Sequence, residues 1–220
     1  MTTRHTAVDS AHPVDDETTA VSSKGWRVID IITAAVLGVA IGLVFWAWNS
    51  IGVMWGTAMD GLTPGLSGLA YGPWLLGGIV GGLVIRKPGA AILVEVIAAL
   101  VSTAIGNQWG IETLYSGIMQ GLGAELVFLL FLYRRFTVEV AMLAGVGAGL
   151  FGAVNEYILY NREKTATFQV IYAASFAVSG AILAGLVGWL LVKALASTGA
   201  LDRFGAGREA RRIAQQSSAA

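Results

Sequence analysis

Hydrophobic residues gather in six long runs, separated by connections that are polar or rich in glycine. Each run has about 16–26 residues, and roughly 20 residues of α-helix cross the hydrocarbon core of a bilayer. The pattern predicts an all-α, polytopic membrane protein with six transmembrane helices, the third being the shortest. The predicted helices are Val28–Trp48, Leu66–Ile85, Ala90–Ile105, Thr113–Tyr133, Val138–Tyr160 and Val170–Leu195.

Composition supports a membrane protein. Hydrophobic residues make up 55% of the 220 residues and charged residues only 13%, and the mean hydropathy is +0.69. These fractions leave too little polar surface for a soluble domain of this length. We therefore expect three parts: a disordered cytosolic tail over residues 1–25, a membrane domain over 26–195, and a polar, basic cytosolic tail that frays over 196–220.

The placement of Lys and Arg predicts the orientation. Basic residues occupy the N-terminal flank, the connections after the second and fourth runs, and the C-terminal flank, whereas the other connections contain only Arg162 and Lys164. The positive-inside rule then places both termini in the cytoplasm. Three connections are predicted to face outward: Asn49–Gly65, Gly106–Glu112 and Asn161–Gln169. The first is long and glycine-rich, which is compatible with a mobile lid or with a plain surface loop.

The side chains of Glu95, Gln120 and Glu125 lie well inside the predicted helices. A carboxylate near the bilayer centre costs about 3 kcal/mol on insertion scales, so such groups are candidates for a functional site. Gln120 and Glu125 are five residues apart, about 140° around the helix, and cannot both point at one neighbouring helix. The alternative for each glutamate is a structural carboxyl group that is protonated or hydrogen-bonded to another helix.

The predicted outer side is also rich in tryptophan and in polar residues at a helix end. Five of the seven tryptophans, including Trp48 and Trp109, fall toward that side. Tryptophan faces with one carboxylate suit a flat, cationic or heteroaromatic ligand, although membrane-interface anchoring explains any single ring. Asn155 and Glu156 lie near the outer end of the fifth run, either as interfacial residues or, as we favour, at the rim of an outward pocket.

Several residue types and motifs are absent from the sequence or from its predicted helices, and their absence excludes some classes of protein. The chain has no cysteine, and its two histidines, His5 and His12, both lie in the N-terminal tail. No phosphate-binding loop and no nucleophile paired with a base is visible in the sequence. The sequence therefore predicts no enzyme, no cofactor, no metal site and no nucleic-acid partner.

Small residues recur at four-residue spacing in several runs, as at Ala34, Gly38 and Gly42. Such stripes allow close approach of helices in lipid. Packing inside the bundle is one interpretation. Docking of a helix from another protein is the other, most plausibly through this stripe.

Six segments of the sequence together carry a family resemblance that extends over about residues 26–193. They are Trp26–Asp30, Phe45–Trp48, Arg86–Ala90 with Glu95, Gly106–Gly110, Gln120–Phe128 and Tyr133–Arg135. The Gln-Gly-Leu-Gly-Ala-Glu run from Gln120 to Glu125 is the most specific part. These segments resemble the YkoE family, whose members are substrate-binding S components of energy-coupling factor (ECF) transporters.

The resemblance implies a vitamin-capturing subunit in the plasma membrane of a prokaryote. It implies a ligand related to thiamine or hydroxymethylpyrimidine, and two kinds of partner: a membrane-embedded coupling protein and cytosolic ATPase subunits. In this interpretation Gln120 and Glu125 bind the aminopyrimidine edge, Glu95 supports them, and the Ala34, Gly38 and Gly42 stripe docks the coupling protein. The complete substrate-binding set is Trp48, Glu95, Asn107, Gln108, Trp109, Gln120, Glu125 and Asn155.

Two other hypotheses remain open from the sequence. One is a stand-alone ion- or proton-coupled carrier, in which Glu95 and Glu125 exchange protons as the substrate moves. The other is a purely structural membrane subunit.

Overall fold

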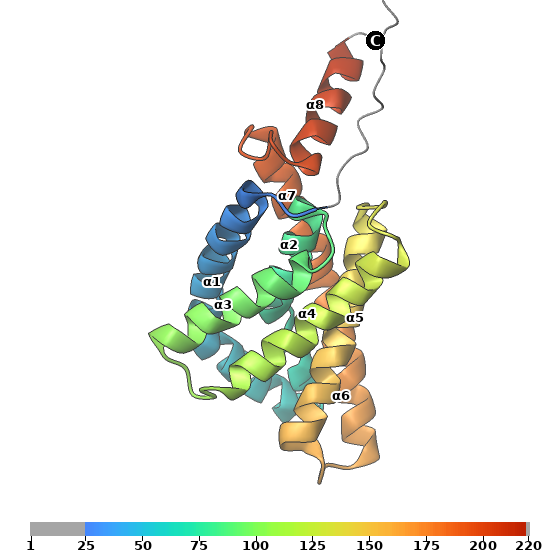
Figure 1. Cartoon of the computed structure of the whole chain (residues 1–220). Helices are drawn as coiled ribbons and strands as arrows, with labels where there is room; N and C mark the ends of the chain where they lie inside the picture. Colours follow the sequence, from blue (N-terminus) through green and yellow to red (C-terminus); the bar gives the residue numbers. More distant parts are fainter. Residues whose placement is uncertain (1–24, 219–220) are drawn as a thin grey trace, which may run out of the picture.

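The computed structural model describes residues 25–218 and contains helices and no strands within that range (Figure 1). The predicted N-terminal tail, residues 1–25, lies almost wholly outside the described residues. The elements are α1 (Val28–Leu62), the 3-10 turns η1 (Leu66–Ala70) and η2 (Gly72–Leu75), α2 (Leu76–Ile85), α3 (Ala90–Ile105), α4 (Glu112–Leu130), α5 (Val138–Glu156) with the π-turn η3 (Tyr157–Asn161), α6 (Ala166–Ser179), the π-helical segment η4 (Gly180–Leu186), α7 (Val187–Ser197) and α8 (Gly205–Ser218).

All six predicted hydrophobic runs fall on helices. Four helical stretches are long and apolar enough to cross a membrane, namely Val28–Leu62, Glu112–Leu130, Val138–Asn161 and Ala166–Ser197. The other two, Gly72–Ile85 and Ala90–Ile105, are apolar but shorter. The start of α1, the α2–α3 turn, the α4–α5 turn and the α7–α8 turn lie at one end of the bundle, and the remaining connections lie at the other (Figure 1).

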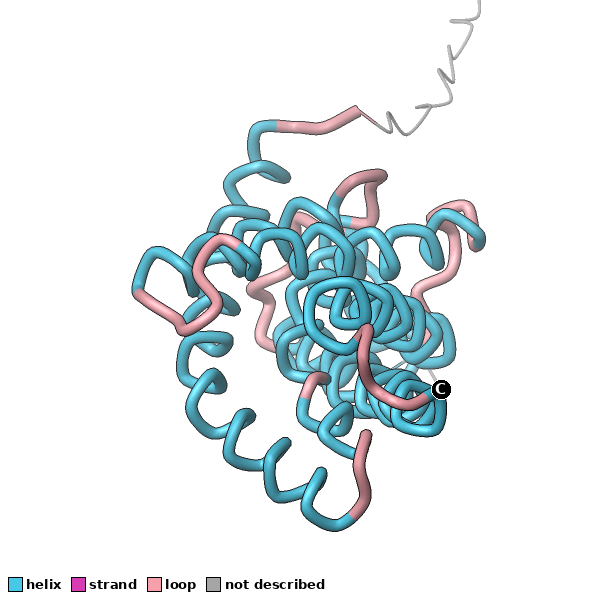
Figure 2. The backbone as a smooth tube through the Cα atoms, turned by 90° about the horizontal axis from the view of Figure 1, so that it is seen from below, coloured by secondary structure: helices cyan, strands magenta, loops and turns pink. Residues whose placement is uncertain are grey.

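Helix α1 continues through the segment that was predicted as an outer loop. It ends at Leu62 instead of Trp48, so most of Asn49–Gly65 is neither a lid nor a surface loop. Its second half passes across the end of the bundle (Figure 2). Gly52 and Gly56 are buried there against neighbouring elements, and a Cβ on Gly52 would come within 2.8 Å of the Trp74 ring. Glycine at this position permits close helix packing. From the sequence alone, the same glycines suggested a loop.

Small residues form most of the helix contacts. A Cβ on Gly145 would come within 2.6 Å of the Gly180 backbone, and one on Gly123 would meet Gly147. The Ala34, Gly38 and Gly42 stripe belongs to the same system, because Ala34 is fully buried and the two glycines face α3. The structure therefore shows these three residues packed inside the bundle, and docking of another protein through this stripe stays a prediction.

The C-terminal segment, predicted to fray, is helical over Gly205–Ser218. One face of α8 carries Ala206 and Ala210, while arginines occupy other positions. Arg86 holds the helix to the end of α2 through an ion pair with Glu209 at 2.8 Å. Amphipathic spacing and this ion pair explain why the segment is ordered although its composition is polar.

Asp30 ties the start of α1 to the α2–α3 turn. Its fully buried carboxylate accepts hydrogen bonds from the Arg27 backbone at 2.8 Å and from Lys87 Nζ at 2.6 Å. The Arg27 side chain completes a reciprocal capping arrangement with the carboxylate at 2.8 Å. Asp30 does more than interact with the helix dipole, because it joins two elements that are far apart in sequence.

Candidate functional site

A cavity lies at the end of the bundle that holds the α3–α4 and α5–α6 connections, and the empty space in it and at its open mouth is about 510 Å³. Six parts of the chain form its wall: α1, the η1–η2 segment, α3, the α3–α4 turn, the first half of α4, and the end of α5 with η3. The lining residues are Phe45, Asn49, Tyr71, Trp74, Glu95, Ala99, Trp109, Thr113, Ser116, Gly117, Gln120, Glu156 and Tyr160.

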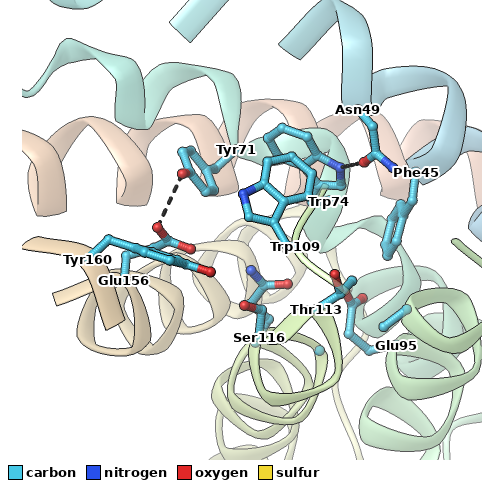
Figure 3. A pocket seen from close by; sticks show the side chains of 13 residues that line it. Phe45, Asn49, Tyr71, Trp74, Glu95, Trp109, Thr113, Ser116, Glu156 and Tyr160 are labelled. Carbon is cyan, nitrogen blue, oxygen red and sulfur yellow. Dashed lines mark hydrogen bonds between the residues drawn. The ribbon is translucent and has the colours of Figure 1, made fainter. Parts of the chain in front are cut away.

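Aromatic rings form one side of the cavity. The Trp74 ring lies edge-on to Trp109 with centroids 5.7 Å apart and to Tyr71 at 5.2 Å (Figure 3). Asn49 fixes Trp74 by accepting a hydrogen bond from its indole N–H at 2.9 Å, and the Asn49 amide donates to Ser102 Oγ at 3.1 Å. The ring faces are thus held in place before any ligand arrives.

Glu95 is fully buried and only partly satisfied. Its Oε2 atom accepts the Gly78 backbone N–H at 2.5 Å, whereas Oε1 has no hydrogen-bond partner within the described part of the chain. The carboxyl group lies against the glycines of α2, since a Cβ at Gly77 would come within 2.7 Å of Oε2. A buried acceptor without a partner is costly, and a donor from a ligand in the cavity would remove that cost.

Two more polar groups in the wall are available to a ligand. Gln120 is buried, and its amide forms no hydrogen bond to any other residue among 25–218; the indole N–H of Trp109 likewise has no acceptor there. Gln120 offers both a donor and an acceptor, and Trp109 offers a donor. With Glu95, these side chains provide complementary hydrogen-bonding groups around one space.

A second carboxylate lies across the aromatic rings from Glu95. Glu156 is buried and accepts a hydrogen bond from Tyr71 at 3.3 Å, and the two carboxylates flank the tryptophan pair in Figure 3. Tyr160 closes this side and donates its hydroxyl hydrogen to Glu112. The cavity therefore has an acidic group at each side and aromatic faces between them.

Some of the sequence-predicted residues support the wall without lining it. Asn107 Oδ1 accepts the backbone N–H groups of Trp109 and Gly110 at 3.0 and 2.8 Å, which shapes the α3–α4 turn and places the Trp109 ring. Asn155 donates to the lining residue Ser116 at 2.8 Å.

The other two predicted residues near this end contribute less directly. Trp48 donates to the Ala70 carbonyl at 2.9 Å and so ties α1 to η1. Gln108 is exposed on the α3–α4 turn. Neither side chain lines the cavity.

Glu125 lies away from the cavity, at the start of α3. Its carboxylate accepts the backbone N–H groups of Gly89 at 2.6 Å and Ala91 at 2.9 Å, as well as the Tyr133 hydroxyl at 2.5 Å. Burial and the adjacent carboxylate raise the pKa of Tyr133 above its ordinary value. Gly89 has a φ of 85°, which suits glycine in this turn. Of the predicted set, the structure places Glu95, Trp109 and Gln120 together in the cavity wall and separates Glu125 from them.

The sequence interpretation missed several lining residues for identifiable reasons. Asn49 was placed in a loop, although it lies on α1. Tyr71 and Trp74 come from 3-10 turns that the hydrophobic pattern assigned to a regular helix. Glu156 was noticed at a helix end, and its pairing with Tyr71 depends on a contact between residues 85 positions apart in sequence.

Comparison with known proteins assigns the chain to a transport class. Residues 29–151 match the family model described as "ABC-type cobalt transport system, permease component". The chain is 32% identical over 197 residues to "Putative HMP/thiamine permease protein YkoE" of Bacillus subtilis (strain 168), a match covering 89% of this chain and 97% of that protein. A solved structure titled "Crystal structure of an S-component of ECF transporter" superposes with a TM-score of 0.81 and 31% identity, covering 88% of this chain and 98% of the other.

The helical fold and the cavity define a substrate-binding membrane subunit, the S component of an ECF transporter. It is thus a multi-pass membrane protein of a transport system and not an enzyme. The chain belongs to the YkoE family, as the sequence resemblance indicated.

Proposed function

We propose that this chain captures thiamine or its hydroxymethylpyrimidine (HMP) precursor in the cavity. The YkoE relative is named as a putative HMP/thiamine permease. The observation that carries the proposal is the buried Oε1 atom of Glu95, which has no partner among residues 25–218, beside the unbonded amide of Gln120. An aminopyrimidine has a donor and an acceptor on one ring edge, which match these two groups.

The ring fits the cavity in a specific manner. Its exocyclic amino group donates to Glu95, and the adjacent ring nitrogen accepts from the amide of Gln120. Because Trp74 and Trp109 are perpendicular to each other, one indole stacks on a face of the ligand ring and the other meets it edge-on, and both supply apolar contact area. Thiamine also has a positively charged ring, and Glu156 on the other side of the aromatic pair is the acidic group suited to receive it.

The proposal includes partners and an orientation. Residues 26–195 form the membrane domain of a protein in a prokaryotic plasma membrane, with both termini in the cytoplasm and the cavity toward the outside. A membrane-embedded coupling protein and cytosolic ATPase subunits supply the energy for release. The sequence supports the assignment of ATP hydrolysis to partner subunits, because it contains no phosphate-binding loop.

Isothermal titration calorimetry on the purified full-length protein tests the proposal. Thiamine and hydroxymethylpyrimidine are titrated separately, and tryptophan fluorescence is recorded in parallel because Trp74 and Trp109 line the cavity. We expect saturable heat and altered fluorescence with at least one of the two ligands at micromolar concentration. Absence of both signals for both ligands contradicts the proposal.

A proton-coupled carrier that works alone is the second candidate. The presence of two buried carboxylates, Glu95 and Glu156, in one cavity favours it. Proteoliposomes that contain only this chain distinguish the two functions. Uptake driven by a pH gradient supports the carrier, whereas uptake that requires added coupling and ATPase subunits supports the S-component mechanism.

The description of the matched family names cobalt, which would make a metal ion the substrate. The described residues contain no group of three or more His, Cys, Asp and Glu side chains placed to hold a metal ion. Metal sites for transport are built from such groups. The available side chains thus favour an organic ligand.

A further inference from the structure

A second hollow lies at the opposite end of the bundle from the cavity, between α7–α8 and the α4–α5 turn. Its volume is about 1550 Å³, and we call it the basic groove. Four basic and two acidic side chains contribute to its lining together with apolar residues of the helix ends. The residues that matter for the inference are Arg134, Arg135, Lys193, Phe136, Trp189 and Val192.

Two arginines of the basic groove have unused hydrogen-bond donors. The side chains of Arg134 and Arg135 are exposed and form no ion pair or hydrogen bond with any residue from 25 to 218. Arg86 differs, because it is paired with Glu209 at 2.8 Å. Glu139 is the remaining acidic residue of the lining. Two adjacent guanidinium groups without a carboxylate partner form a site for an anion with several oxygen atoms.

Apolar surface continues directly from these arginines. Leu130 and Leu132, at the end of α4, are 79% and 57% exposed. On the other side, Phe136 and Trp189 line the groove, which we call its floor; Arg86 lies over one face of Phe136 at 4.5 Å and Lys193 over one face of Trp189 at 5.1 Å. The arginines follow a helix that is long and apolar enough to cross a membrane. They are therefore at the depth where the hydrocarbon core gives way to lipid headgroups.

We propose that the basic groove binds an anionic phospholipid. The phosphate accepts hydrogen bonds from Arg134 and Arg135, while one acyl chain lies along the floor formed by Phe136, Trp189 and Val192. Charge complementarity selects the anionic headgroup, and the contiguous apolar floor selects a lipid over a free anion. The ligand also fills the space between α8 and the α4–α5 turn, so its binding stabilises the position of α8.

Native mass spectrometry of the full-length protein provides the test. The protein, in detergent, is equilibrated with equal amounts of phosphatidylglycerol and phosphatidylcholine of the same acyl length. The double variant Arg134→Gln/Arg135→Gln is compared with Arg203→Gln/Arg212→Gln. The control removes two exposed arginines at the same end of the bundle that do not line the groove. Melting temperatures confirm that both variants are folded.

We expect the wild type to retain phosphatidylglycerol in preference to phosphatidylcholine. The preference falls about thirtyfold in Arg134→Gln/Arg135→Gln and less than about threefold in the control, since each basic residue close to an anionic lipid contributes about 1 kcal/mol. Equal retention of the two lipids by the wild type overturns the proposal. Equal losses in the two double variants also overturn it, because they indicate general surface attraction.

Two further measurements separate a lipid from a free anion. Excess inorganic phosphate is expected to leave the bound lipid in place, and displacement by phosphate alone contradicts lipid binding. Ala210→Trp puts a large side chain into the groove while keeping both arginines. This variant is expected to lose the lipid, and unchanged retention excludes the groove as the position of the acyl chain.

Discussion

Glu95→Gln separates ligand binding from fold stability. Glutamine retains one oxygen for the Gly78 backbone N–H, which Glu95 now accepts at 2.5 Å. Its other end is an amide NH₂ group, so a donor replaces the acceptor Oε1 that has no partner in residues 25–218. The substitution thus removes the proposed contact with the ligand amino group and leaves the helix contact intact.

The expected loss of affinity follows from the hydrogen bond that disappears. Removing one partner of a buried hydrogen bond costs about 1–3 kcal/mol, which corresponds to a dissociation constant about 5- to 150-fold higher. Calorimetry with hydroxymethylpyrimidine measures this change. The melting temperature without ligand is expected to stay the same or rise, because the variant no longer buries a carboxylate with an unsatisfied oxygen.

Glu125→Gln is the matched comparison. Glu125 is also buried and also accepts backbone N–H groups, but these belong to the first turn of α3 and to Gly89. Weakening this cap is expected to cost about 1–2 kcal/mol of stability, with ligand affinity unchanged. Wild-type affinity in Glu95→Gln refutes the reasoning. So does a loss of affinity in Glu125→Gln without a lower melting temperature.

Three other substitutions, one of them with a matched control, test the remaining parts of the structure. Glu156→Gln is expected to weaken thiamine binding about tenfold, or about 1.4 kcal/mol, and to leave hydroxymethylpyrimidine binding unchanged in calorimetry; equal losses contradict a separate site for the charged ring. Gly145→Ala introduces a Cβ within 2.6 Å of the Gly180 backbone and is expected to lower the free energy of unfolding by about 1–3 kcal/mol or more, as measured by thermal unfolding. Gly61→Ala is the control, because a Cβ there has no neighbour within 4 Å, and its stability is expected to be equal or higher. Asp30→Asn removes the carboxylate that pairs with Lys87 at 2.6 Å and is expected to cost about 3–5 kcal/mol; an unchanged melting temperature contradicts the role of this pair.

Local pattern was sufficient to predict a helical structure for each of the six apolar runs, although it missed α8 and the second half of α1. Stretches of about 20 apolar residues have few stable alternatives to a membrane-crossing helix, because an unpaired backbone group is costly in lipid. Glycine was the main source of error. In Asn49–Gly65 it suggested a loop, but Gly52 and Gly56 lie on α1 at close contacts. Composition alone does not distinguish a glycine that ends a helix from a glycine inside a helix that allows a second helix to pack closely.

The site was predictable only in part for a related reason. Glu95 and Glu125 give the same signal in sequence, since each is a carboxylate in an apolar run. Their partners differ: Glu125 has several backbone and side-chain donors, and Glu95 has one backbone donor. Tyr71 and Glu156 meet across 85 residues, and no local pattern contains that information.

The sequence by itself determined that this protein is helical, embedded in a membrane and a member of a transport family, because hydrophobic periodicity and family motifs are local properties of the chain. Only the tertiary structure decided which polar side chains share a cavity and which cap a helix. Whether a buried acceptor remains available to a ligand depends on the donors that other helices bring to it, and packing of the whole bundle sets those positions.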